Sequence, residues 1–94
     1  MGLEYTVKLY NDVVKKDIPT LDSSVRKTVK NAINAKLTTS PQLYGKPLRQ
    51  SLKGWRKLRA RDYRVVFRIR GKIVEIAAVQ HRSVVYANVI KRFG

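Results

Sequence analysis

Side chains suited to proton transfer and phosphate binding lie together near the end of the chain: His81, Arg82, Ser83 and Tyr86. An imidazole can act as a general acid or base, and a guanidinium can bind a phosphate through two parallel hydrogen bonds. A tyrosine ring can stack on an unpaired base. For His81 the alternative is a structural or merely exposed side chain, and for Tyr86 it is packing of a terminal helix. We expect three other tyrosines only to pack: Tyr5, Tyr10 and Tyr44.

Basic side chains recur along two consecutive segments with strand character, 55–61 and 63–70. Side chains alternate across a strand, so residues two apart share a face. One face of the second segment is apolar and should pack under helices; it consists of Tyr63, Val65, Phe67 and Ile69. The opposite face then carries basic side chains of both segments, namely Lys57, Arg59, Arg61, Arg64, Arg68 and Arg70. We expect a basic groove there, lined also by a few apolar side chains, that suits a phosphate backbone.

Hydrophobic periodicity predicts the elements that must position these residues. Residues 3–10 alternate as a first strand, and a short helix follows that Pro19 stops. Apolar residues then recur every four positions and predict a longer helix with one buried stripe, formed by Leu21, Val25, Val29, Ile33 and Leu37. Either Asp22 or Thr20 can cap the start of that helix.

The remaining elements are a connector, three strands and a final helix. Residues 41–53 form the connector, with turn signals at Ser40-Pro41 and Gly45-Lys46-Pro47. Strands are expected at 55–61, 63–70 and 73–81, and a terminal helix at 84–93. The order β-α-α-β-β-β-α over residues 1–94 predicts a single α+β domain, with the helical pair on one face of a mostly antiparallel sheet.

Composition removes several kinds of chemistry. The chain has no cysteine and a single histidine, so we expect no metal, no disulfide and no cysteine nucleophile, and no cofactor is indicated. The longest apolar stretch, residues 73–79, is short and contains Glu75, so no membrane span and no membrane partner are expected. The first residues lack the pattern of a signal peptide, which leads us to expect a cytoplasmic protein.

Charge gives the strongest indication of a partner. Twenty-one Lys and Arg residues against six Asp and Glu give a formal net charge of +15 on 94 residues. Thirteen of the cations but only two of the carboxylates follow Pro47. Such a field attracts polyanions and accelerates their association. We therefore expect a nucleic acid, an acidic protein, or both in turn as partners.

An ordered set of motifs in the second half resembles a known family. The motifs are Gly45-Lys46-Pro47-Leu48, then Leu52-Lys53-Gly54-Trp55-Arg56-Lys57-Leu58-Arg59, then Asp62-Tyr63-Arg64-Val65-Val66-Phe67 and finally His81-Arg82-Ser83-Val84-Val85-Tyr86. In this order and spacing they resemble the RelE/ParE superfamily of bacterial and archaeal toxins, and the resemblance covers nearly the whole chain. It implies a RelE-like, microbial-ribonuclease-type architecture and a toxin of a type II toxin–antitoxin pair.

For the RelE-like branch, the resemblance implies an endoribonuclease, an mRNA interferase that cuts messenger RNA in the ribosomal A site. The ribose 2′-OH attacks the adjacent phosphate and expels the 5′-oxygen, which leaves a 2′,3′-cyclic phosphate. The candidates for catalysis are Lys57, Arg64, His81, Arg82 and Tyr86. Further arginines are expected to bind RNA, namely Arg56, Arg59, Arg61 and Arg68. The implied partners are the ribosome, messenger RNA and an acidic, RelB-like antitoxin.

Each catalytic candidate has a role in that reaction. Arg64 and Arg82 would bind the phosphorane, which carries more negative charge than the ground state. Lys57 could take the proton of the 2′-OH, since neighbouring positive charges disfavour a protonated amine. His81 or Arg82 would assist the leaving oxygen, and Tyr86 could stack on the splayed base.

One departure from the family pattern leaves a second function open. Family ribonucleases often have several more basic residues near the end of the last strand, where this chain has Ser83-Val84-Val85. ParE-like relatives share the fold and the Tyr-Arg and His-Arg elements, and they inhibit DNA gyrase without cutting nucleic acid. The ribonuclease branch is favoured by four residues together: Lys57, Arg64, Arg82 and Tyr86. Gyrase inhibition is the alternative, and a plain nucleic-acid-binding module is a third possibility.

Overall fold

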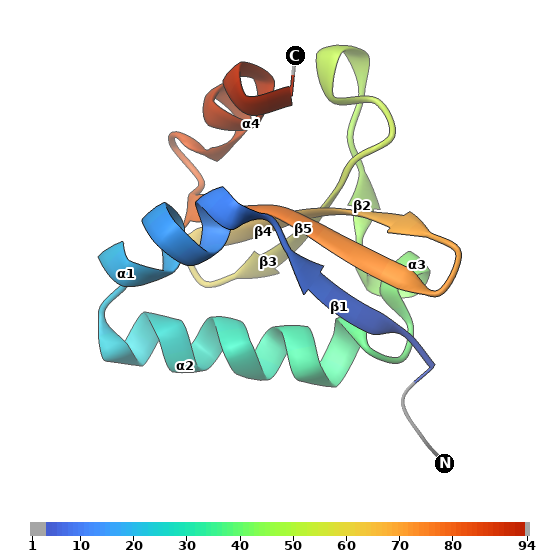
Figure 1. The fold of residues 1–94 in the computed structure, drawn as a ribbon, viewed down its shortest axis with the longest axis horizontal. Coiled ribbons are helices and arrows are strands. Elements are labelled where there is room, and N and C mark those ends of the chain that lie inside the picture. The colour runs from blue at the N-terminus through green and yellow to red at the C-terminus, as the bar shows by residue number, and fades with distance from the viewer. Residues whose placement is uncertain (1–3, 94) are drawn as a thin grey trace.

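A five-stranded mixed sheet forms the centre of the molecule in the computed structural model, which describes residues 4–93 (Figure 1). The strands are β1 (Thr6–Leu9), β2 (Lys46–Pro47), β3 (Arg56–Ala60), β4 (Tyr63–Arg70) and β5 (Ile73–His81), in the order β1-β5-β4-β3-β2. β1 runs parallel to β5, and the other neighbours are antiparallel. The predicted α+β class with a mostly antiparallel sheet is confirmed. Leu3, in the predicted first strand, lies outside the described residues.

Helical segments lie on both faces of this sheet. They are η1 (Val13–Asp17), α1 (Ile18–Thr20), α2 (Ser23–Ala32), η2 (Ile33–Leu37), α3 (Pro41–Tyr44), η3 (Gln50–Leu52) and α4 (Val85–Phe93). η1 and η2 have the wider π-helical turn, and η3 is a 3₁₀ turn. η1 and α2 pack on one face of the sheet, as predicted, and α4 covers part of the other (Figure 1).

The longest helix forms where the sequence predicted it. Asp22 caps α2, because its carboxylate accepts a hydrogen bond of 2.9 Å from the N–H of Val25. The apolar residues spaced four apart all join the main core, which they share with Val65 and Phe67 of β4. η2 continues the helix to its predicted end. Packing against this helix places Val65 and Phe67 on the face of β4 that α2 covers, and alternation leaves Arg64 on the opposite face.

Pro19 does not stop the first helix, contrary to the prediction. It is the second residue of α1, which continues directly from η1, and the φ of about −65° that its ring imposes suits a helical residue. The chain stays helical to Thr20, and Leu21 is extended. Asp17 is the last residue of η1, where α1 continues the helical segment, and it is only 2% exposed.

The connector predicted at 41–53 contains two short helices and an edge strand. Pro41 begins α3 rather than a turn, because proline suits the first position of a helix. β2 pairs with β3, and this pairing places Lys46 opposite Lys57. A strand of two residues is too short to show a period-2 pattern, which is why the sequence did not indicate it.

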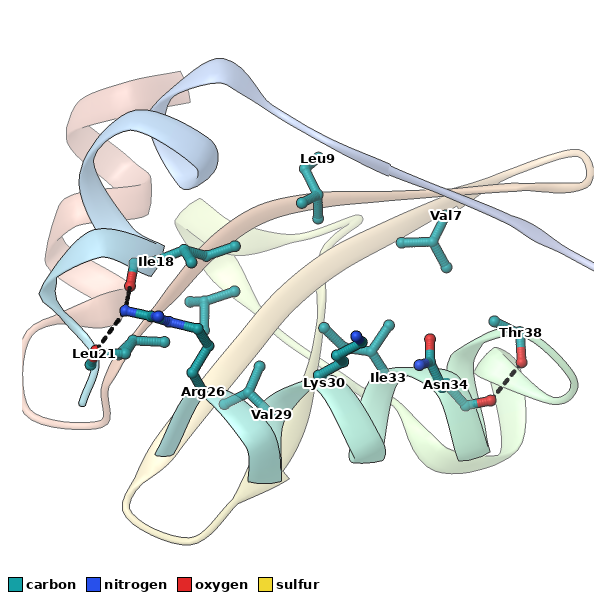
Figure 2. Close-up of a pocket in the computed structure, with 11 residues that line it drawn as sticks. Val7, Leu9, Ile18, Leu21, Arg26, Val29, Lys30, Ile33, Asn34 and Thr38 are labelled. Carbon is teal, nitrogen blue, oxygen red and sulfur yellow. Dashed lines mark hydrogen bonds between the residues drawn. The ribbon is translucent and has the colours of Figure 1, made fainter. Parts of the chain in front are cut away.

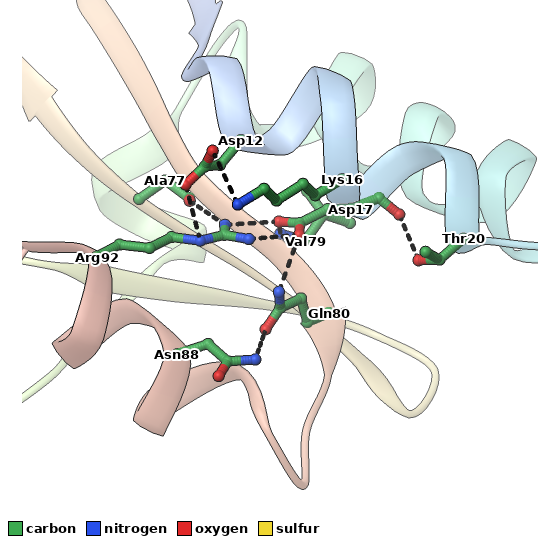
Figure 3. A network of polar contacts seen from close by, with 9 residues as sticks. All are labelled: Asp12, Lys16, Asp17, Thr20, Ala77, Val79, Gln80, Asn88 and Arg92. Carbon is green, nitrogen blue, oxygen red and sulfur yellow. Dashed lines mark hydrogen bonds and ion pairs between the residues drawn. The ribbon is translucent and has the colours of Figure 1, made fainter.

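A buried ion pair joins Arg92 of α4 to Asp17 of η1, and both side chains also form hydrogen bonds with β5 (Figure 3). The Arg92 guanidinium donates hydrogen bonds of 2.7 and 2.9 Å to the Asp17 carboxylate and one of 3.0 Å to the carbonyl of Ala77. Asp17 also accepts hydrogen bonds from the N–H of Val79 (3.0 Å) and the side-chain amide of Gln80 (2.8 Å). Burial opposes the ionisation of Asp17, but these donors, Arg92 first, outweigh it and hold its pKa below the usual value.

We expect Asp17→Ala to lower the free energy of unfolding by about 3–5 kcal/mol, because the Arg92 guanidinium then stays buried without its partner. The matched control is Asp12→Ala. Its carboxylate lies 3.5 Å from Arg92 and 3.8 Å from Lys16 but is 42% exposed, so we expect a loss below about 1 kcal/mol. Urea unfolding at neutral pH measures both, and equal losses would contradict the role given to Asp17.

The Asp17 carboxylate also makes the free energy of unfolding depend on pH in the acid range. The pKa of Asp17 is lower in the folded than in the unfolded chain, so its contribution is complete above the unfolded value of about 4. The contribution is lost as the pH falls through the folded pKa. Wild type should therefore lose more stability than Asp17→Ala between about pH 5 and pH 2.

Candidate active site

Six residues line an open pocket at one end of the sheet, with a volume of about 440 Å³: Lys57, Arg64, His81, Arg82, Ser83 and Tyr86. They come from β3, β4, the end of β5, the turn that follows it and the first turn of α4. The antiparallel pairing of β4 with β5 places His81 opposite Tyr63, which brings the end of one strand beside the start of the other. All five residues expected to be catalytic therefore lie around one pocket.

Cations on this face stand directly opposite one another across the strands. Arg59 on β3 pairs with Arg64 on β4, and Lys46 on β2 pairs with Lys57 on β3. Like charges in opposite positions destabilise a sheet. Within residues 4–93, none of these four cations forms an ion pair with a carboxylate. The arrangement suits an anionic ligand, and Lys46 is a member that the sequence missed because its motif indicated only a turn.

Main-chain carbonyls, rather than buried carboxylates, hold the two arginines of the pocket. Nη1 of Arg64 donates to the carbonyls of Arg61 (2.9 Å) and Tyr63 (2.8 Å), which anchors the guanidinium through one of its three nitrogens. The main-chain N–H of Arg82 donates a hydrogen bond of 2.8 Å to the Asp62 carbonyl, while the side-chain Nε of Arg82 lies 3.9 Å from the Asp62 carboxylate. An exposed pair at that distance is weak, so Arg82 can exchange it for a phosphate.

The residue two positions further along the chain orients His81. The His81 Nδ1 accepts a hydrogen bond of 3.1 Å from the N–H of Ser83 and lies 2.8 Å from the Ser83 hydroxyl oxygen. A main-chain N–H can only donate, so Nδ1 carries a lone pair and the proton of the neutral ring is on Nε2. The ring also packs edge-on against Tyr63, with 5.5 Å between ring centres. His81 therefore offers Nε2–H as its free donor.

Tyr86 packs against the core and also lines the pocket. It packs partly against the second core cluster, in which Val85 and Val89 of α4 are fully buried. Its side chain also lines the pocket, and Nζ of Lys57 lies 5.8 Å from the ring centre. Because the two valines fix α4 to the sheet, the ring has a set position on which a base can stack.

Three of the four arginines expected to bind RNA lie away from the pocket, and Arg61 and Arg56 are two of them. Arg61 adopts a φ of 57° in the turn between β3 and β4, and its guanidinium donates to the hydroxyl of Ser24 on α2 at 3.1 Å. Arg61 therefore does not join the basic face, contrary to the alternation argument, which holds only within a strand. Arg56 is partly buried, and its guanidinium donates to the carbonyl of Gly45 at 2.9 Å.

Arg68 belongs to a separate cluster further along β4. Its Nε lies 2.7 Å from the Glu75 carboxylate, its Nη2 donates to the hydroxyl of Tyr10 at 2.8 Å, and its guanidinium lies 4.8 Å from the centre of the Trp55 ring. The hydrogen bond from Arg68 holds the pKa of Glu75 below its usual value. Of the four arginines expected to bind RNA, Arg59 is the one beside the pocket, opposite Arg64.

A separate cavity, of about 400 Å³, lies between β1 and α2, away from the candidate site (Figure 2). Its lining is mostly apolar, with Val7 and Leu9 on the strand and Val29 on the helix. Arg26 also lines it, but the guanidinium donates to the Leu21 carbonyl at 3.0 Å. The cavity lacks the opposed cations and the imidazole of the first pocket, so it offers no comparable chemistry.

Residues 4–93 contain neither a metal-binding cluster nor a membrane-spanning helix. In 4–93, no group of three or more His, Asp and Glu side chains is placed to hold a metal ion. No helix in that range is long and apolar enough to cross a membrane.

Comparison with known families points to one group of toxins. Residues 7–86 match the family model described as the ParE toxin of the type II toxin–antitoxin system parDE. Among curated proteins, none matches the chain.

Solved structures with this fold include toxins of such systems. The RelBE2 toxin–antitoxin complex from Mycobacterium tuberculosis has 30% sequence identity and a TM-score of 0.77, over 85% of this chain and 100% of that chain. A free mutant of the E. coli toxin RelE has 23% identity and a TM-score of 0.73, over 98% and 100%. A YoeB/ParE toxin from Agrobacterium tumefaciens has 17% identity and a TM-score of 0.61, over 82% and 98%. With most of its length matched, the chain belongs to the ParE toxin family, in the RelE/ParE superfamily of type II toxin–antitoxin toxins.

Proposed function

We propose that this toxin is a ribosome-dependent endoribonuclease that cleaves messenger RNA in the A site and so stops translation in the cytoplasm. The observation that carries the proposal is a single pocket lined by all five candidates: Lys57, Arg64, His81, Arg82 and Tyr86. Two guanidinium groups, an imidazole N–H, an amine and an aromatic ring suit an in-line attack of a 2′-OH on the adjacent phosphate.

The reaction needs one proton removed and one supplied. The amine of Lys57 accepts the proton of the ribose 2′-OH as that oxygen attacks the adjacent phosphorus. The bond from phosphorus to the 5′-oxygen of the next nucleotide breaks, and this oxygen takes a proton from water while Nε2–H of His81 donates a hydrogen bond to it. The products are a 2′,3′-cyclic phosphate and a free 5′-hydroxyl.

The two arginines of the pocket act on the charge that develops at phosphorus. Arg64 is anchored through Nη1, so its other nitrogens can donate to the phosphorane oxygens. Arg82 reaches the same phosphate after leaving its weak pair with Asp62 and also assists the leaving oxygen. Because the phosphorane carries more charge than the bound substrate, these donors favour the transition state.

The partner that restrains this toxin is an acidic antitoxin. Neighbouring structures that are toxin–antitoxin complexes support an antitoxin as the partner. The opposed cations of β2, β3 and β4 support its acidic character, because carboxylates laid over them would relieve the repulsion. An antitoxin segment over the pocket would also exclude RNA.

Inhibition of DNA gyrase without nuclease activity is the second candidate function. The match of residues 7–86 to the ParE toxin family favours it. On this alternative, the same basic face would contact a protein surface, and no RNA bond would break.

Induced expression with two readouts separates these functions. We expect primer extension on a translated message to find new ends within the reading frame, and protein synthesis to fall before DNA synthesis. A copy of the message without its start codon is the control, since it should stay intact. DNA breaks and a damage response with intact messages would identify the gyrase inhibitor instead.

A further inference from the structure

A second pocket adjoins the first and shares two of its cations. Lys57 and Arg64 line both pockets, and each pocket has a volume of about 440 Å³. The second is completed by Leu43, Tyr44, Lys46 and Arg59. The two pockets are neighbours on the same basic face, with Tyr86 in the first and Tyr44 in the second.

Tyr44 is more open to solvent than the packing role expected from the sequence implies. It is 49% exposed, and its neighbour Leu43 is 79% exposed. Nζ of Lys36 lies over one side of the Tyr44 ring, 5.4 Å from its centre, and about half of the residue's surface is still exposed. An accessible aromatic ring beside an apolar side chain and several cations suits a ligand that is both flat and anionic. A nucleotide of a single strand has these properties.

The main chain around Tyr44 is held in place. Its N–H donates a hydrogen bond of 3.3 Å to the carbonyl of Ser40, the residue before α3. The next residue, Gly45, lies against the ring of Phe67, where any side chain would collide, and its carbonyl accepts the 2.9 Å hydrogen bond from Arg56. A ring on a fixed segment loses little conformational freedom when a base stacks on it. Arg56 therefore supports the second pocket instead of contacting its ligand.

The charges of the second pocket are unbalanced within the protein. Its four cations are the two opposed pairs, Lys46 with Lys57 and Arg59 with Arg64. A phosphate backbone laid along them relieves a repulsion that the folded protein otherwise bears. Because Lys57 and Arg64 belong to both pockets, a phosphate held by these two lies between two positions for bases.

We propose that the second pocket binds an unpaired RNA base next to the cleaved bond, stacked on Tyr44 beside Leu43, with its phosphate on Lys46 and Arg59. The proposal rests on the proposed function, in which the first pocket holds the bond that is cut. Stacking requires no particular hydrogen-bonding edge, so this contact tolerates any base. An acidic peptide is the competing occupant, and the experiment separates it from RNA.

The experiment measures binding rather than cleavage, so its result does not depend on nuclease activity. The probe is a short single-stranded RNA with 2′-fluoro groups in place of the 2′-hydroxyls, which removes the nucleophile, and with an abasic nucleotide placed at each position in turn. Tyr44→Ala is compared with Tyr44→Phe, which keeps the ring. Val14→Ala, at a 52% exposed position of η1, is the surface control. Fluorescence anisotropy at low salt gives Kd, and thermal unfolding verifies each fold.

We expect Tyr44→Ala to raise Kd about 5- to 100-fold, and Tyr44→Phe and Val14→Ala to change it less than about twofold. One abasic position should weaken wild type by the same factor and Tyr44→Ala no further, because both changes remove one stacking contact. An unchanged Kd, or losses that multiply at every position, overturns the proposal. Weaker binding of an acidic antitoxin peptide with unchanged RNA binding would also overturn it. RNA binding as expected in a protein that never cleaves would instead reject the nuclease and keep this site.

Discussion

Arg64→Ala and Arg82→Ala are each expected to lower the single-turnover rate of message cleavage by about 10²- to 10³-fold, the usual loss when one donor to a developing charge is removed. Both guanidinium groups line the pocket, and neither is held by a close ion pair there. The loss should appear in the rate at saturating substrate, because the phosphorane needs these donors more than the bound message does. Arg64→Lys and Arg82→Lys should recover part of it, since an ammonium carries the charge but lacks the two-pronged geometry.

A matched control for these variants is Arg70→Ala on the same strand as Arg64. The Arg70 side chain is 63% exposed and lies 4.0 Å from Glu75, outside the residues that line the pocket. Its removal also takes one positive charge from the molecule, so it measures the general effect of charge on binding to a ribosome. Arg64→Ala and Arg82→Ala proteins that unfold normally and cleave as fast as Arg70→Ala would show that the pocket is not the active site.

The sequence could predict on which face of the sheet each side chain of the long strands lies, because burial and alternation agree there. Val65 and Phe67 enter the core under α2, and this places Arg64 on the other face. Positions of side chains outside regular strands could not be predicted in this way. Arg61 is one residue beyond β3, where a φ of 57° turns its side chain towards Ser24.

Contacts between segments far apart in the chain could not be predicted from the sequence either. Asp17 and Arg92 are 75 positions apart, and neither the helical pattern of η1 nor that of α4 indicates that a charged residue will be buried. Lys46 belongs to a two-residue strand whose only local signal was a turn. The sequence therefore predicted the residues of the first pocket, which depend on β3, β4 and β5. It missed Lys46 of the second pocket, because that residue is placed by the pairing of the connector with β3.

Cleavage of a message in a ribosome with an empty A site should be on the order of 10³-fold faster than cleavage of the same RNA free in solution, because positioning can supply that much rate. None of the six residues lining the first pocket carries a carboxylate, and its proton donors and acceptors are one imidazole and one amine beside the two guanidinium groups. General acid–base catalysis contributes about 10²- to 10⁴-fold even with well-matched groups. The remainder must come from holding the 2′-oxygen, phosphorus and 5′-oxygen in line.

An open pocket that grips one phosphate through two arginines does not impose that alignment on a flexible strand. A message held by the ribosome is already restrained on both sides of the codon, and the basic surface of the toxin can bind ribosomal RNA around it. Single-turnover rates on one message, free, in an empty A site and in an A site filled by transfer RNA, measure the effect; the filled site is the control and should protect the message. Equal rates on free and ribosome-bound RNA would make this protein a free ribonuclease. No cleavage in any state would leave gyrase inhibition as the function that the basic face serves.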